Sequence, residues 1–214
     1  RPAVDEFPLA QWRRLLLRQY RTENLAGLDY AVDGRGDPAL RAAVASYLTR
    51  ARAVECDAEQ VVIVNGSQQA LSLISQVLLD RGDTAALEEP GYLGARNAFQ
   101  AYGARLHPVA VDEAGIVPEA LPAKGARLLY VTPSHQFPTG AVLSLARRLE
   151  LLQWAQATDT WVIEDDYDSE FAMSLSRCLR CRAWQRTIRC FMSVRFLKSC
   201  FPPCASAISS YRAR

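Results

Sequence analysis

Apolar and polar residues alternate in two rhythms along the first 170 positions of the 214-residue chain. The stretch PALRAAVASYLTRARAV (38–54) repeats apolar residues at helical spacing, and Asp37 and Pro38 favour a helix start there. The β-branched run Val61–Val64 predicts a strand that leads through a Gly-Ser turn into a second helix. Strand, turn and helix in this order make half of a βαβ unit.

The same rhythm continues to about position 171. Further strands are expected in DTAALEEP, RLHPVAVD, ARLLYVTPS and TWVIEDDYDSEF, and further helices after EEPGY and in SLARRLELLQWAQATD. Short apolar strands separated by helices predict an α/β fold with a mostly parallel sheet and helices on both faces. Ligands bind such sheets outside the carboxyl ends of the strands, where the polar turns of this chain fall.

Two of these turns could hold an anionic, flat ligand. NGSQQAL places Ser67 and Gln68 at a helix N-terminus, where free N–H groups and the helix dipole favour an anion. Ser67 is also a good N-cap, which is the alternative role of an isolated Gly-Ser turn. In EEPGYLGAR, the ring of Tyr92 could project over a flat ligand, or Tyr92 could be an ordinary half-buried turn residue.

Two later turns carry further polar side chains. VTPSHQFPTG ends a strand with several hydrogen-bonding groups, and we expect His135 to act as a hydrogen-bonding residue rather than as a metal ligand. VIEDDYDSEF ends the last clear strand in acids; it could be a solvated acidic loop or a divalent metal site. Alternatively, its strand delivers one carboxylate into a partly buried site, where that group could hold a protonated ring nitrogen.

Together, GSQQAL, EEPGY, TPSHQFPTG, RRLELLQWA and IEDDYDSEF resemble the aminotransferase-like domain of MocR-type regulators, a branch of the GntR transcription factors. That domain has the fold-type I architecture of enzymes that use pyridoxal 5′-phosphate (PLP). The upstream segment YAVDGRGDPALRAAVASYL is similar to the family as well, so the resemblance covers roughly residues 5–171. It implies that residues 31–171 are an incomplete fold-type I large domain.

The resemblance also implies a cofactor site. Ser67 and Gln68 would bind the PLP phosphate, and Tyr92 would stack on the pyridine ring. Asp165 would pair with the ring nitrogen, and Tyr167 would hydrogen-bond the ring hydroxyl. His135 and Gln136 are carried over only as loop residues near the ring.

Composition separates a tail from this domain. Half of the chain is hydrophobic, enough for a sizeable core, but residues 171–214 hold nine basic residues, no acidic residue and no glycine. Five of the six cysteines lie there too. We therefore divide the chain into an N-terminal segment with a first helix (1–30), the α/β domain (31–171) and an irregular, basic tail (172–214).

We hypothesise that a shifted reading frame explains the tail. Suitable synonymous codons for FMSVRFLKSCFPPCASAISSY (191–211), read one nucleotide earlier, encode YVGTFLKVLFPALRIGYLV, which is similar to the family's lysine-bearing segment. We therefore expect residues from about Ala172 onward to be out of frame. Lys198 falls at the position of the family's Schiff-base lysine, but its neighbours do not match, and we expect a solvated charge and an inactive chain.

Two other roles for the tail remain open. Cys178 and Cys181 form a C-x2-C pair, with Cys190, Cys200 and Cys204 downstream, so the tail could be a zinc module, although these spacings fit no common finger. Its basic residues and interleaved aromatic residues could instead bind nucleic acid. We nevertheless expect no metal site in the chain.

Within the family, two functions compete. One is an effector-sensing domain that binds PLP and an amino compound and reports to an N-terminal DNA-binding domain; the other is an aminotransferase acting on amino acids and 2-oxo acids. The motifs favour the first, and the intact protein is expected to be a homodimer that binds DNA only through that missing domain.

Arg1 in place of Met suggests part of a longer protein. Without an apolar run of about 18 residues or a signal peptide, we expect a soluble, cytoplasmic chain with no membrane partner.

Overall fold

The computed structural model describes residues 7–21, 34–52, 54, 56–167, 190–195 and 206–211. Its α-helices are α1 (Leu9–Arg21), α2 (Pro38–Arg52), α3 (Ser67–Leu78), α4 (Leu93–Ala101) and α5 (Leu145–Ala157), with 3₁₀ turns η3 (Ala58–Gln60) and η4 (Pro118–Ala120). Its strands are β1 (Val61–Val64), β2 (Thr84–Glu89), β3 (Arg105–Asp112), β4 (Gly115–Ile116), β5 (Leu128–Val131), β6 (Trp161–Asp166), β7 (Cys190–Arg195) and β8 (Ser206–Tyr211).

The strands form one sheet in the order β1-β8-β7-β6-β5-β2-β3-β4. Neighbours from β3 to β7 are all parallel, whereas β4 and β8 run antiparallel to the strands beside them. Because β8 is antiparallel to both β1 and β7, β1 runs in the same direction as the parallel strands. The carboxyl ends of β1, β2, β5 and β6 therefore meet at one edge of the sheet, as the polar turns predicted.

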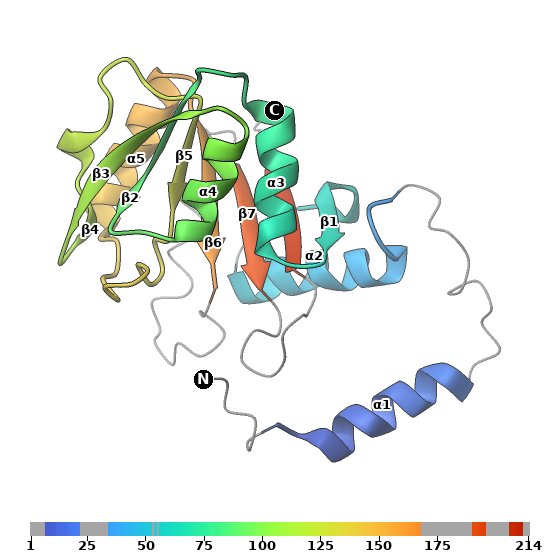
Figure 1. Ribbon diagram of the computed structural model, residues 1–214. Helices are drawn as coiled ribbons and strands as arrows, with labels where there is room; N and C mark the ends of the chain where they lie inside the picture. The colour runs from blue at the N-terminus through green and yellow to red at the C-terminus, as the bar shows by residue number, and fades with distance from the viewer. Residues whose placement is uncertain are drawn as a thin grey trace.

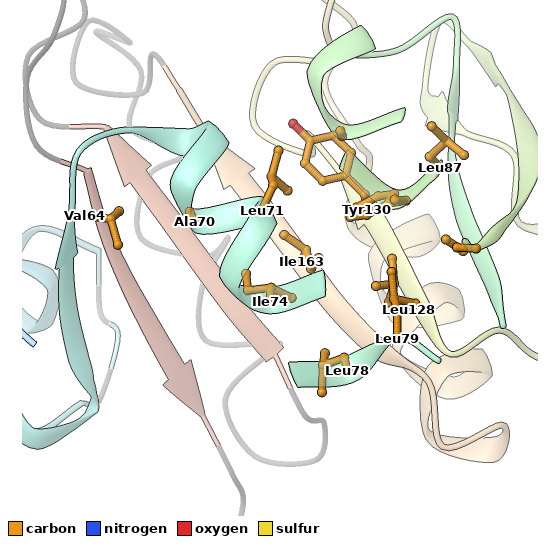
Figure 2. Packing of buried hydrophobic residues seen from close by; sticks show 14 residues of the cluster. Val64, Ala70, Leu71, Ile74, Leu78, Leu79, Leu87, Leu128, Tyr130 and Ile163 are labelled. Atoms are coloured by element: carbon orange, nitrogen blue, oxygen red, sulfur yellow. The ribbon is translucent and has the colours of Figure 1, made fainter. Parts of the chain in front are cut away.

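Helices cover both faces of the sheet (Figure 1). On one face α3 and α4 pack on the sheet, and Figure 2 shows Leu71 and Ile74 of α3 beside Tyr130 and Ile163 of the strands. On the other face, Leu151 and its neighbours in α5 pack on alternate residues of the same strands. All four residues of β5 are buried, as expected for a strand covered on both sides. The predicted α/β class is confirmed.

Two stretches of the tail differ from the irregular structure that composition predicted. β7 pairs in parallel with β6, from Val162 opposite Cys190 to Asp166 opposite Val194, and β8 joins β7 to β1. The backbone edge of β6 is a template for pairing, and CFMSVR contains aromatic and β-branched residues that suit a strand. This corrects the expectation of an irregular tail for residues 190–195 and 206–211. The domain boundaries themselves stay a prediction.

Candidate functional site

The N-terminus of α3 lies immediately beyond the carboxyl end of β1. Gly66, not Ser67, is the N-cap, and its backbone has φ 138° and ψ 170°. Only glycine adopts this conformation without strain. Because Gly66 occupies the N-cap position, Ser67 is the first residue of the helix, and the alternative role of Ser67 as N-cap is wrong. The N–H groups of the first turn have no partner within the helix. They offer a place for an anion at this edge of the sheet.

Gln68 and Tyr92 connect this helix to the turn after β2. The side-chain amide of Gln68 donates a 2.9 Å hydrogen bond to the Tyr92 hydroxyl. Gly94 makes the contact possible, because a Cβ atom there would lie 2.1 Å from Gln68 Nε2 and 2.5 Å from Tyr92 Cζ. The predicted anion-binding turn and the predicted ring are therefore neighbours.

Asp165 lies at the carboxyl end of β6 and is only 2% exposed. The Tyr130 hydroxyl from β5 donates a 2.7 Å hydrogen bond to Asp165 Oδ2. Glu164 lies on the opposite face of β6, where its Oε1 is 4.0 Å from Nη1 of Arg148 in α5. Because Glu164, Asp165 and Asp166 are all buried, the solvated-loop alternative is wrong for these three residues.

Sequence reasoning missed Tyr130. Its position offered a signal, since Tyr130 stands opposite Ile163, two residues before Asp165, and so shares one face of the sheet with that carboxylate. A buried tyrosine hydroxyl needs a hydrogen-bond partner, and a carboxylate on the neighbouring strand supplies one. Register between strands far apart in sequence was needed to bring these two groups together.

Four rings form an aromatic row along the same edge: Tyr92, Phe137, Tyr167 and His135. The Tyr167 hydroxyl lies 3.1 Å from Nδ1 of His135, and the two rings stack at 5.8 Å with an interplanar angle of 26°. Phe137 meets Tyr92 and Tyr167 edge-on, each at a centroid distance of 6.1 Å. His135 is thus a hydrogen-bonding residue, as expected, and Tyr167 is one of its partners.

Gln136 lies inside the loop and is 1% exposed. Its amide nitrogen donates to Glu88 Oε2 and to the carbonyl oxygens of Pro90 and Phe137, and its Oε1 accepts from Thr139. Burial raises the pKa of Glu88, although hydrogen bonds from Thr132 and Gln136 act in the opposite direction. Gln136 therefore connects the loop after β5 to the end of β2 and to the turn that follows it.

The remaining predicted site residue and the tail cysteines cannot be placed. Lys198, Cys178, Cys181, Cys200 and Cys204 lie outside the described residues, and only the backbone of Cys190 is described. Within the described part of the chain, no cluster of three or more His, Cys, Asp or Glu side chains could hold a metal ion. No helix in that part is long and apolar enough to cross a membrane.

The site thus joins three kinds of group at one sheet edge: a helix N-terminus, a buried carboxylate and a row of rings. Such a set suits a flat ligand with an anionic substituent and a basic ring atom. The family model for aminotransferase class I and II matches residues 9–192. The chain therefore belongs to the class I and II aminotransferase family.

Two transcription regulators are similar to this chain over most of its length. The probable rhizopine catabolism regulatory protein MocR of Rhizobium meliloti is 44% identical over 172 residues, covering 79% of this chain and 34% of that protein. The HTH-type transcriptional regulator TauR of Rhodobacter capsulatus is 34% identical over 196 residues, covering 92% of this chain and 40% of that protein. The aminotransferase-like domain of MocR-type regulators is thus the class to which this chain is similar.

A solved structure shows the same fold with a cofactor-derived ligand. LysN, the alpha-aminoadipate aminotransferase of Thermus thermophilus, was solved with N-(5'-phosphopyridoxyl)-L-leucine. It is 30% identical with a TM-score of 0.81, over 98% of this chain and 54% of that chain. The chain thus spans about a third to a half of the lengths of these relatives. PLP is the cofactor of the family.

Proposed function

We propose that this chain is part of a PLP-binding, aminotransferase-like domain that senses an effector in a transcription regulator. The observation that carries the proposal is the meeting of α3, Tyr92 and the buried Asp165 at one sheet edge. The similarity to MocR and TauR supports the regulator, since both are named as regulatory proteins. DNA binding in the whole protein would belong to a separate N-terminal domain.

The residues present fit PLP in the chemistry of their groups. The first turn of α3 would hold the phosphate, with the Ser67 hydroxyl and the Gln68 amide as additional donors. A Cβ atom at Gly66 would meet nothing within 4 Å, so the approach to these donors is open. Tyr92 would cover the ring, and the Tyr167 hydroxyl would bind the ring hydroxyl.

Asp165 would keep a proton on the ring nitrogen, because a buried carboxylate stabilises a positive charge beside it. Tyr130 orients that carboxylate by donating to Oδ2. PLP, when bound, supplies an electron sink for chemistry at the amino group of an amino compound. The chain's own groups would bind and orient the cofactor and hold that proton. Lys198 falls at the sequence position of the family's Schiff-base lysine, but we expect it not to attach the cofactor.

A second function, a PLP-dependent aminotransferase acting on amino acids and 2-oxo acids, is favoured by the likeness to LysN. In either case the ligand would be a small amino compound, the intact protein would be a homodimer and its location would be cytoplasmic. The two functions differ in turnover. In a chain re-encoded in the lysine-bearing frame, formation of a 2-oxo acid from an amino acid in the presence of PLP supports the enzyme. Its absence from that chain, if the chain binds PLP, supports the sensor.

Equilibrium dialysis against PLP and against pyridoxal, which lacks the phosphate, tests the proposal. We expect PLP to bind at least about tenfold more tightly, because charge-assisted hydrogen bonds at α3 add to the contacts of the ring. Replacing Ser67 with alanine should weaken PLP binding and leave pyridoxal binding unchanged. Equal binding of both compounds, or no binding, would overturn the proposed phosphate site.

A further inference from the structure

Glu88 is a buried carboxylate at the end of β2 that the proposed cofactor contacts do not use. Its side chain is 2% exposed and accepts three kinds of hydrogen bond. Thr132 N lies 3.2 Å from each oxygen, Thr132 Oγ1 lies 2.6 Å from Oε2, and Gln136 Nε2 lies 3.2 Å from Oε2. Glu88 therefore ties the end of β2 to the loop that follows β5.

The same two partners hold the backbone of one residue in that loop. Phe137 N donates to Thr132 Oγ1 at 3.1 Å, and Gln136 Nε2 donates to the Phe137 carbonyl oxygen at 2.7 Å. Gln136 Nε2 also donates to Pro90 O at 2.8 Å, in the turn that leads to Tyr92. The backbone of Phe137 is thus fixed by groups that converge on Glu88.

Phe137 in turn separates two rings of the aromatic row. Its ring meets Tyr92 at 88° and Tyr167 at 87°, so it sets the spacing between the proposed ring cover and the proposed ring-hydroxyl partner. We propose that Glu88 is a positioning residue that acts through Thr132 and Gln136 to hold Phe137 between Tyr92 and Tyr167. Its consequence for PLP rests on the proposed function, but the positioning itself does not.

A carboxylate suits this position because it only accepts hydrogen bonds. Glutamine would place an NH₂ group near the N–H of Thr132 or near the amide of Gln136, so two donors would face each other. The neighbouring Glu89 gives a matched control, because its exposed side chain instead pairs with Arg96.

Amide hydrogen exchange of the whole chain without PLP tests the positioning. In Glu88→Gln we expect the Phe137 amide to exchange about tenfold faster, because a buried hydrogen-bond network loses a partner. Amides of β5 and α5 should keep their rates, and Glu89→Gln should match the wild type. Glu88→Asp, which keeps the carboxylate, should restore part of the protection of the Phe137 amide against exchange. If Glu88 only stabilised the fold, its loss would instead speed exchange equally throughout the sheet.

A second variant tests the same network if Glu88→Gln does not fold. Thr132→Val removes the hydroxyl between Glu88 and Phe137 while keeping a branched side chain, and it should speed exchange of the Phe137 amide to a similar extent. Unchanged exchange at Phe137 in the folded variants would overturn the proposal. Equal acceleration throughout the sheet would overturn it too.

PLP dialysis separates this proposal from the proposed function. If the wild type binds PLP, Glu88→Gln should bind it about tenfold more weakly and Glu89→Gln should not, because a loosened row no longer presents Tyr92 and Tyr167 together. Faster loop exchange with unchanged PLP affinity would overturn the link to the cofactor. Failure of the wild type to bind PLP would overturn the proposed function, while the exchange rates would still decide the role of Glu88.

Discussion

Tyr130 donates a hydrogen bond to Asp165 across two neighbouring strands, and both side chains are almost completely buried. The 2.7 Å contact fixes one oxygen of the carboxylate proposed to bind a ring nitrogen. Phe99 meets the Tyr130 ring edge-on at 6.2 Å, so the tyrosine is held from the α4 side as well. The proposed site is in this way continuous with the core.

Tyr130→Phe should destabilise the protein by about 1–3 kcal/mol, because the buried carboxylate of Asp165 loses a donor that water does not replace. Urea unfolding measures this loss. Tyr102→Phe is a matched control, since the Tyr102 hydroxyl contacts Ser72 and Gln76 in a more exposed setting, and it should cost less. Equal losses in the two variants would contradict the assigned role of Tyr130.

Gly94→Ala should displace Tyr92. The added methyl would overlap Gln68 Nε2 and the Tyr92 ring, so the hydrogen bond between those two side chains should break. Helix propensity alone would instead stabilise the protein by up to about 1 kcal/mol, which makes the sign informative. We expect a net loss in urea unfolding and a changed near-UV circular dichroism spectrum; a gain with an unchanged spectrum would refute the close packing.

The stability contributed by Glu88 should depend on pH. Burial, together with the charge of Asp165, raises the pKa of Glu88 above the ordinary value of 4.5. The folded protein therefore binds the proton more tightly than the unfolded chain, and this contribution is complete below that ordinary value and lost as the pH rises through the folded pKa.

Urea unfolding across this pH range, in the wild type and in Glu88→Gln, measures the linkage. The stability of the wild type relative to the variant should fall as the pH rises, because glutamine does not titrate. The loop residues that face Glu88, Thr132 and Gln136, are neutral, and the charged neighbour is Asp165 on β6. Asp165→Asn should therefore reduce the dependence of this stability difference on pH. A difference that stays flat or rises with pH would show that burial does not dominate.

Much of the fold follows from local patterns. Val61–Val64 forms β1 as its β-branched run predicts, and α5 lies within the segment of helical periodicity. The strand β7 was missed because the composition of residues 172–214 as a whole predicted irregular structure, although CFMSVR itself suits a strand and pairs with β6. The choice of β6 as the partner of β7 is a tertiary effect that local sequence does not encode.

The candidate site likewise contains some residues that local sequence predicts and others that it does not. The turns that carry Ser67, Tyr92 and Asp165 could be found from polar residues after apolar strands. Glu88 could not be singled out, since its partners lie 44 and 48 residues away in the chain. Likewise, Ser67 looked like a cap until the backbone of Gly66 showed otherwise.

The coding DNA should carry the family's lysine segment in another frame. Sequencing across codons 172–214 should reveal YVGTFLKVLFPALRIGYLV one nucleotide out of phase. A chain re-encoded in that frame should form a borohydride-fixed PLP adduct at its lysine, whereas Lys198 of the present chain should not. DNA that lacks the segment would contradict the shifted frame, and an adduct on Lys198 would contradict the expectation that this lysine is a solvated charge.

A pair of adjacent variants tests whether Asp165 is the carboxylate that holds the ring nitrogen of PLP. Asp165→Asn and Asp166→Asn remove the same charge from neighbouring buried positions on opposite faces of β6. With folding verified by circular dichroism, PLP dialysis should show affinity lowered by at least about tenfold in Asp165→Asn and little changed in Asp166→Asn. Equal affinities in the two variants would show that Asp165 does not hold the ring nitrogen.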